Sequence, residues 1–317
     1  MSSHLDLELA AALTTLTGGA ESAPSPELGD WQTIRDVTEA TCAALATLVP
    51  KRPKITRTDY RATSADGTTV KLRWFSSDEM RRGPAVVHAH GGGMIAGTVE
   101  LFDPWIAYYA AESGVPILSV DYRRAPEARG AALAQDLYAG LTWLIENATK
   151  LGVQPARIAL MGESAGGGIA AGAAILARDN NVTLAKQILI YPMLDDRNIT
   201  PDPQLASFAT WTWSYTNNHT GWSTLLGDQF GTNTVSPVAA PARLKDAAGL
   251  ASTYIEVGDL DIFRDEDIAY SDQLKRAGVI VQLIVRPGLN HGFDLFAPEA
   301  TATRRATQDR LGVIRAL

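Results

Sequence analysis

The sequence predicts an α/β protein with a mostly parallel sheet covered by helices on both faces. Strand-like apolar runs alternate with helical patterns along the chain, as in such folds. The 317 residues can bury a large core, and 46% hydrophobic with 20% charged residues is typical of globular proteins. Eight strand-like runs are expected, near residues 54–62, 69–75, 85–90, 116–121, 157–161, 186–191, 252–257 and 279–286.

Turn and capping residues support individual elements. Residues 65–67 (Ala-Asp-Gly) are a hairpin signal between the first two runs, so that edge of the sheet should be antiparallel. Leucines at spacings of four, four and three over residues 133–144 predict one buried helix face. A further helix is expected over about residues 265–277, with Gly278 as a C-terminal cap.

A candidate nucleophile lies at the end of the fifth run. Residues 162–166 read Gly-Glu-Ser-Ala-Gly and are followed by a helix of small residues, the setting that a nucleophile elbow requires. The turn would expose the hydroxyl of Ser164, while Gly162 and Gly166 let strand and helix approach closely. Ala165 could then aim its N–H group at an oxyanion. The alternative is a glycine-rich turn with an incidental serine.

A second glycine motif favours the catalytic interpretation. Residues 91–93 are all glycine and directly follow the buried run that contains His88 and His90. The N–H groups of Gly92 and Gly93 are expected to face one oxygen, where a Cβ atom would crowd the substrate. The alternatives are a flexible glycine loop and a phosphate cradle, and the usual phosphate-binding glycine motifs are absent from this stretch. We expect His90 to bond the loop backbone and His88 to be a satisfied core histidine.

The general base should follow the serine along the chain, because in hydrolases with this type of nucleophile elbow the serine is followed first by the acid and then by the histidine. Two of the five histidines qualify, His219 and His291. His219 lies in a tryptophan-rich stretch with no strand before it. His291 follows the run at residues 279–285 and a short loop, and catalytic groups gather where parallel strands end. His291 is therefore the predicted base.

The third member should be a carboxylate between the serine and the base. Asp261 comes just after the run at residues 252–257, where it would orient the imidazole and stabilise its protonated form. Asp259 is the alternative by position. Asp265 and Glu266 fit better as first-turn residues of the next helix, where carboxylates complement the helix dipole.

Several motifs together resemble those of the hormone-sensitive-lipase-type carboxylesterases. They occur in the family's order, as HGGG at residues 90–93, DYRRAPE at 121–127, GESAGG at 162–167, YPMLD at 191–195, DIFRDE at 261–266 and HGF at 291–293. The resemblance implies an α/β-hydrolase fold with a helical cap. It also implies a catalytic triad formed by Ser164, Asp261 and His291. The oxyanion N–H groups that it implies are those of Gly92, Gly93 and Ala165.

Some positions depart from the family pattern. Glu163 stands where many members have Asp, Arg124 replaces a Leu, and the motif at residues 261–266 lacks its proline. The His-Pro-rich continuation after Glu127 is also missing. These departures leave the reacting groups in place, but Arg124 and the missing continuation are expected to change packing near the floor of the active site.

Two segments fall outside the alternation of strands and helices. Residues 1–50 are helix-prone and are expected to form the N-terminal part of the cap, while residues 196–235 are an insertion too long for an ordinary loop. The hydrolase core then comprises residues 51–195 and 236–317. The insertion is rich in aromatic residues, which predicts either an apolar substrate pocket or a small aromatic core. The candidate substrate contacts are Trp211, Trp213 and Tyr215.

These features predict a serine carboxylesterase that acts through an acyl-enzyme, and the family resemblance implies short- to medium-chain esters as substrates. An amidase, carbamate hydrolase or lactonase could use the same triad. A non-catalytic ligand-binding protein is a further alternative, but it would be expected to lack a triad member. No cofactor or metal is expected, because the sequence has no HExxH motif and no cluster of Cys and His ligands.

Composition and charge restrict the kinds of partner and the cellular location that are expected. The net charge of −7 argues against nucleic acid, and no apolar stretch is long enough for membrane insertion. The acidic start is not typical of a signal peptide and Cys42 is the single cysteine, so a cytoplasmic location is expected. The apolar run at residues 279–285 is a candidate edge strand, and dimers through this strand are known in the family. This predicts a homodimer.

Overall fold

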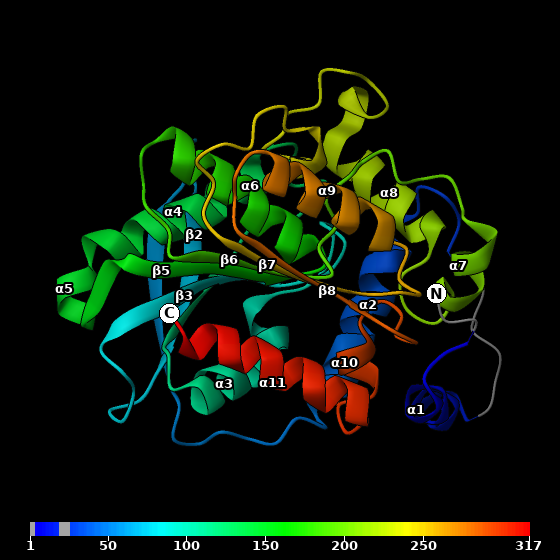
Figure 1. Ribbon diagram of the computed structural model, residues 1–317, viewed down its shortest axis with the longest axis horizontal. Helices are drawn as coiled ribbons and strands as arrows, with labels where there is room; N and C mark the ends of the chain where they lie inside the picture. The colour runs from blue at the N-terminus through cyan, green and yellow to red at the C-terminus, as the bar shows by residue number, and fades with distance from the viewer. Residues whose placement is uncertain (1–3, 19–25) are drawn as a thin grey trace.

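The computed structural model describes residues 4–18 and 26–317, and its centre is an eight-stranded sheet with the order β1-β2-β4-β3-β5-β6-β7-β8 (Figure 1). The strands are β1 (Thr56–Thr63), β2 (Thr69–Ser76), β3 (Gly83–Ala89), β4 (Ile117–Asp121), β5 (Val153–Glu163), β6 (Lys186–Ile190), β7 (Thr253–Gly258) and β8 (Val281–Arg286). β2 pairs antiparallel with β1 and β4, and the other pairs are parallel. The predicted mostly parallel sheet with an antiparallel edge is confirmed.

Helices cover both faces of this sheet. One face carries α4, α6 and α9, and the opposite face carries α3 and α11 (Figure 1). Their bounds are α3 (Val99–Ser113), α4 (Ala132–Glu146), α6 (Ala165–Asp179), α9 (Arg264–Arg276) and α11 (Thr301–Arg315). The predicted leucine face of α4 is fully buried, and Gly278 follows α9 at a φ of +82°, so both expectations are confirmed.

Burial follows the position of each strand in the sheet. Every residue of the inner strands β3 and β7 is buried, whereas the edge strands β1 and β8 are partly exposed. Shorter helical turns complete the layers, namely α5 (Ala148–Leu151), α10 (Phe293–Phe296), η1 (Gly227–Gln229) and η2 (Pro241–Arg243). None of the helices formed by the described residues has both the length and the apolar character needed to cross a bilayer.

The remaining helices gather at one end of the sheet, on the right in Figure 1. They are α1 (Leu7–Thr17), α2 (Trp31–Ala46), α7 (Pro203–Ala209) and α8 (Tyr215–Leu226). α2 packs against α8, and the N–H of Gly29 donates to the hydroxyl of Thr220 at 3.0 Å. The N-terminal segment and the insertion therefore contact each other. Residues 1–3 and 19–25 of the expected N-terminal cap segment lie outside the described residues.

Candidate active site

Ser164 occupies the sharp turn between β5 and α6. Its backbone has φ of 56° and ψ of −123°, a conformation that residues with a side chain rarely adopt. The flanking glycines allow the turn: a Cβ atom on Gly162 would lie 2.2 Å from the carbonyl oxygen of Gly166. A Cβ atom on Gly166 would lie 2.0 Å from the carbonyl oxygen of Ala89. The close approach expected of a nucleophile elbow therefore requires glycine at both positions.

Three side chains from the ends of separate strands meet at this turn. Nε2 of His291 lies 2.9 Å from Oγ of Ser164, and Nδ1 of His291 lies 2.8 Å from Oδ2 of Asp261. Asp261 is 1% exposed and His291 8%, so water screens their interaction little. The other carboxylate oxygen of Asp261 accepts the N–H of Phe263 at 2.9 Å, which fixes the carboxylate toward the imidazole.

Asp259, the alternative acid, lies nearby but faces another group. Its Oδ1 accepts the N–H of Gly288 at 2.7 Å, in the loop that joins β8 to His291. The structure thus brings Asp261 to the imidazole and directs Asp259 to the backbone of the histidine loop. Asp265 and Glu266 both lie in the first turn of α9, as expected.

The imidazole of His291 is held between two aromatic rings. Tyr191 and Phe263 meet it edge-on, with ring centroids at 4.8 Å and 4.9 Å. The hydroxyl of Tyr191 donates to Asp294 at 2.7 Å, and Asp294 also pairs with Arg310 of α11. Burial raises the pKa of Tyr191 well above its usual range, so the hydroxyl stays protonated and remains a donor.

The glycine loop runs directly beside the serine. A Cβ atom on Gly91 would lie 3.5 Å from Cβ of Ser164. Gly92 and Gly93 have φ of 127° and 60°, in the region that favours glycine. The carbonyl of Gly92 accepts two N–H groups from further along the loop, at 3.1 Å and 2.8 Å, which folds the loop into a tight turn. Ala165 begins α6, where the first N–H groups have no partner within the helix.

A carboxylate next to the serine also holds this loop. Oε1 of Glu163 accepts the N–H of Gly91 at 3.0 Å, and Oε2 lies 2.9 Å from Nε2 of His88. Nδ1 of His88 lies 3.1 Å from the hydroxyl of Ser119, so the prediction of a satisfied core histidine is confirmed. In the sequence, Glu163 stands out only as a departure from the family motif. Its partners are 72 and 75 residues away along the chain, so no local signal indicates this contact.

His90 supports the start of the loop from inside the core. Its ring stacks on Phe102 and Tyr122, with centroids at 5.3 Å and 4.3 Å. Burial lowers its pKa to about 3, so the ring is neutral. Nδ1 lies 2.8 Å from the carbonyl oxygen of Gly91, which confirms the predicted bond to loop backbone.

The aromatic insertion approaches the same loop. A Cβ atom on Gly93 would lie 2.0 Å from Cη2 of Trp213, so the indole fills the space above this glycine. Trp213 is 6% exposed. Trp211 is half-buried against the core layer that contains α3 and α11, and Tyr215 is buried at the start of α8. Of the three predicted aromatic contacts, Trp213 is the one that these distances bring to the loop.

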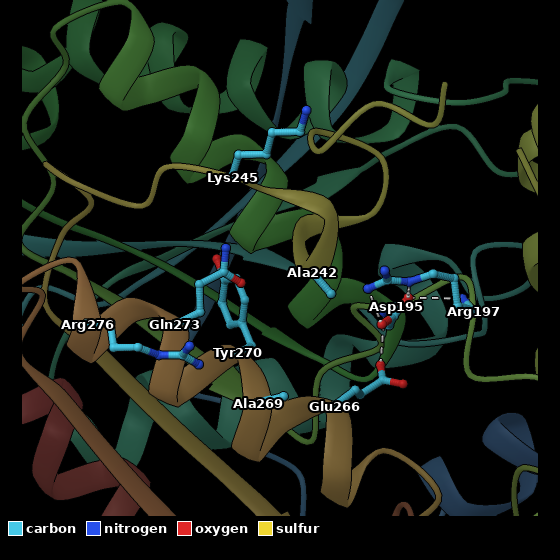
Figure 2. Close-up of a pocket in the computed structure, with 9 residues that line it drawn as sticks. All are labelled: Asp195, Arg197, Ala242, Lys245, Glu266, Ala269, Tyr270, Gln273 and Arg276. Atoms are coloured by element: carbon cyan, nitrogen blue, oxygen red, sulfur yellow. Dashed lines mark hydrogen bonds and ion pairs between the residues drawn. The ribbon is translucent and has the colours of Figure 1, made fainter. Parts of the chain in front are cut away.

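A separate hollow of about 420 Å³ lies beside α9 (Figure 2). Its lining side chains are Asp195, Arg197, Ala242, Lys245, Glu266, Ala269, Tyr270, Gln273 and Arg276. The carboxylate of Glu266 accepts the N–H groups of Leu194 and Asp195 at 2.6 Å and 3.1 Å, which ties α9 to the loop after β6. None of these lining residues belongs to the triad. Within the described part of the chain, no group of three or more His, Cys, Asp or Glu side chains could hold a metal ion.

The chain is similar to known proteins in both sequence and fold. The family model described as alpha/beta hydrolase fold matches residues 86–295. A carboxylesterase of Mycobacterium tuberculosis is 33% identical over 263 residues, 82% of each chain, and an ethyl acetate hydrolase of Pseudomonas putida is 30% identical over 246 residues, 74% of each. The solved structure of a bacterial heroin esterase has a TM-score of 0.86 at 34% identity, covering 98% of this chain and 97% of that one. The chain is thus similar to esterases over most of its length.

Proposed function

This chain belongs to the hormone-sensitive-lipase-type esterases of the α/β-hydrolase fold, and from that premise we propose that it hydrolyses short- to medium-chain esters through an acyl-enzyme on Ser164. It is a carboxylic ester hydrolase. The observation that carries the assignment of Ser164 is its line of hydrogen bonds through His291 to Asp261. Such a line turns a weakly nucleophilic hydroxyl into a reactive one.

Acylation begins when Oγ of Ser164 attacks the ester carbonyl carbon and Nε2 of His291 takes the hydroxyl proton. Asp261 accepts from Nδ1, which selects the tautomer with Nε2 open and stabilises the imidazolium without taking its proton. When the tetrahedral intermediate collapses, the C–O bond to the alcohol breaks and Nε2 protonates the departing oxygen. Water then attacks the acyl-enzyme with the same histidine as base, which releases the acid and restores the serine.

The negative charge of each tetrahedral intermediate is assigned to the N–H groups of Gly92, Gly93 and Ala165. The proximity of Gly91 to Ser164 and the start of α6 at Ala165 support this assignment. Fixed donors of this kind act on charge that develops only in the transition state. The loss of one donor costs on the order of 10²–10³ in rate.

We assign the cap over the serine to residues 1–50 and 196–235, with Trp213 as a wall of the substrate pocket. Trp211 and Tyr215 are proposed as further contacts from the same insertion. The indole above Gly93 supports this view, because it fills the space beside one of the proposed oxyanion donors. A narrow apolar pocket favours short or medium chains on the ester.

The test is hydrolysis of p-nitrophenyl esters from acetate to decanoate by the wild type and by Ser164→Ala. We expect saturable wild-type activity that falls by about 10⁴ or more in the variant, because the covalent step is lost. The rate should decline toward the longest chain if the pocket is narrow. Comparable activity in both proteins would exclude Ser164 as the nucleophile, and inactivity of a folded wild type on every ester would contradict the proposed substrate class.

We further propose a homodimer through β8. This strand is an edge of the described sheet, and next to it Ile280 is 79% exposed while Val285 is 38% exposed. An exposed apolar edge tends to pair with another chain or to be covered. Size-exclusion chromatography with light scattering at micromolar concentration would give the mass of two chains; the mass of one would contradict the proposal.

We also propose a cytoplasmic location. Cys42 is the single cysteine of the sequence and is buried in α2, which suits a reducing compartment. Burial raises the pKa of its thiol to about 12, so the side chain behaves as an apolar core group. Cell fractionation with activity measured in each fraction would check the location, and recovery mainly outside the cytoplasm would contradict it.

A further inference from the structure

One face of α2 is bonded to the main chain of the glycine loop. Arg35 and Glu39 lie one helical turn apart on this helix. Nε of Arg35 donates to the carbonyl oxygen of Ile95, and Oε1 of Glu39 accepts the N–H of Gly97 at 3.1 Å. Ile95 belongs to the tight turn closed on Gly92, because its own N–H donates to the carbonyl of that glycine. The helix therefore holds the loop just beyond the proposed oxyanion donors.

The same two side chains take part in crossed ion pairs with the segment after β4. Both terminal nitrogens of Arg35 lie 2.7 Å from the carboxylate of Glu127, and Nη1 of Arg124 donates to Glu39. Nη1 of Arg124 also donates to the carbonyl of Gly97 at 3.1 Å. The side chains of Arg124 and Glu39 are 27% and 29% exposed, so this pair is screened less than a surface pair. Arg35 is 14% exposed, but its partner Glu127 is 55% exposed, so solvent screens that pair more.

Arg124 is one of the positions where this chain departs from the family pattern, which has Leu there. A leucine could neither pair with Glu39 nor donate to the carbonyl of Gly97. The substitution noted in the sequence therefore creates a contact between the cap and the loop. The hydrogen bond from Arg35 lowers the pKa of Glu127 to about 2, so this partner stays charged at any pH near neutrality.

We propose that Arg35, Glu39 and Arg124 are positioning residues, which hold the loop so that the N–H groups of Gly92 and Gly93 face the oxyanion. The inference rests on the proposed function. The successive glycines have no side chains to fix the position of their N–H groups, so besides the internal turn the loop depends on contacts from other residues. Glu163 holds one end of the loop through the N–H of Gly91. Arg35, Glu39 and Arg124 hold the other end, where Glu39 accepts the N–H of Gly97. A displacement of about 1 Å in such a site can cost on the order of 10² in rate.

The test compares Glu39→Ala, Arg124→Leu and the double variant with wild type on p-nitrophenyl butyrate. We expect kcat to fall about tenfold in each single variant with KM changed less than about twofold, because the loop stabilises the transition state and not the bound ester. The Ki of a trifluoromethyl ketone should rise in parallel with the loss of kcat/KM, since its serine adduct carries the oxyanion. The double variant should lose less than the product of the single losses, because both side chains act on Gly97.

Two further variants separate positioning from general stability. Glu112→Ala removes the pair between Arg52 and Glu112 at 3.0 Å, which does not involve the loop, and should leave kcat unchanged. Glu39→Gln keeps an acceptor for the N–H of Gly97 and should retain most of the activity. If Glu39→Ala fails to fold, Arg124→Leu carries the test. Wild-type kcat and unaltered inhibitor Ki in the folded variants among Glu39→Ala and Arg124→Leu would overturn the inference alone. An inactive wild type would overturn the proposed function, and the inference with it.

Discussion

Asp259 and Asp261 lie two residues apart after the same strand, yet their carboxylates have different partners. Asp261 meets Nδ1 of His291 at 2.8 Å, while Asp259 accepts the N–H of Gly288 at 2.7 Å. Chain position alone leaves Asp259 open as the alternative, because both follow the carboxyl end of β7, while the motif at residues 261–266 favours Asp261. A local turn, closed by the N–H of Asp261 on the carbonyl of Gly258, directs the two side chains to different partners.

Substitution of the two aspartates should therefore give different phenotypes. Asp261→Asn should lower kcat by about 10⁴, because an amide selects the wrong imidazole tautomer and cannot stabilise the imidazolium. Asp259→Asn should retain activity within about tenfold and lower the thermal midpoint by a few degrees, since a bond to loop backbone is weakened. Steady-state kinetics and thermal unfolding of both variants check this. The reverse pattern would make Asp259 the third member of the triad.

The site residues that the sequence could predict are those in short motifs. Ser164 and the loop glycines stand in patterns that few other functions require, chain order then leaves two histidines, and the preceding strand favours His291 over His219. The pair of Glu163 with His88 and the cluster around Arg35 could not be predicted in this way. Their partners lie 27 to 92 residues away, and only the packed fold brings them together.

At the level of elements, the predicted strands differ from the observed ones mainly at their ends. β5 begins at Val153 and not near residue 157, because Val153 still pairs with Gly83 of β3. β8 begins at Val281 and not at 279, since the chain is still leaving the turn at Gly278. Apolar periodicity reports the buried middle of a strand well. It carries little information about exposed ends, where the backbone pairing of a neighbour decides the boundary.

The C-terminal helix α11 is joined by a buried charge to the short helix that follows His291. Arg310 is 1% exposed and pairs with both Glu256 of β7 and Asp294 of α10. It also donates to the hydroxyl of Tyr109 on α3 at 2.9 Å. The guanidinium of Arg310 thus links α11 to β7, α10 and α3. The removal of such a partner leaves buried carboxylates without their counter-charge.

Arg310→Met should therefore destabilise the protein by about 3–5 kcal/mol, although methionine fills similar space. Arg304→Met is the matched control on the same helix, because Arg304 is 58% exposed and meets Glu299 at 3.4 Å. The control should change the free energy of unfolding by less than about 1 kcal/mol. Urea unfolding of both variants measures the difference. Equal stability of the two would mean that the buried pair is not a major link between α11 and the sheet.

For the whole molecule, a buried acid links stability to pH. Asp267 on α9 is fully buried, and neither of its oxygens has a hydrogen-bond partner among the described residues. Burial raises its pKa well above the ordinary value, with the nearby Glu266 and Asp261 adding to the effect. The folded protein therefore favours the neutral acid, while the unfolded chain releases the proton at ordinary acidic pH.

The sign of the pH effect follows from linkage. Below about pH 4 Asp267 is protonated in both states and makes no pH-dependent contribution to stability. As the pH rises, only the unfolded chain ionises, so stability falls by up to about 1.4 kcal/mol per pH unit until the pH passes the folded-state pKa. Asp267→Asn cannot ionise, so its stability advantage over wild type should be small near pH 5 and grow toward neutral pH.

Urea unfolding of Asp267→Asn between about pH 5 and 9 measures this difference. The control is Asp272→Asn on the same helix, whose side chain is 57% exposed and lies 3.7 Å from Lys275; it should show no such trend. A difference between Asp267→Asn and wild type that stays constant with pH would mean that the carboxyl has the same pKa in both states. The unpartnered acid would then have to be solvated in the folded protein. A difference that grows with pH would show that α9 carries a neutral acid beneath its surface, whose ionisation opposes folding of the whole molecule.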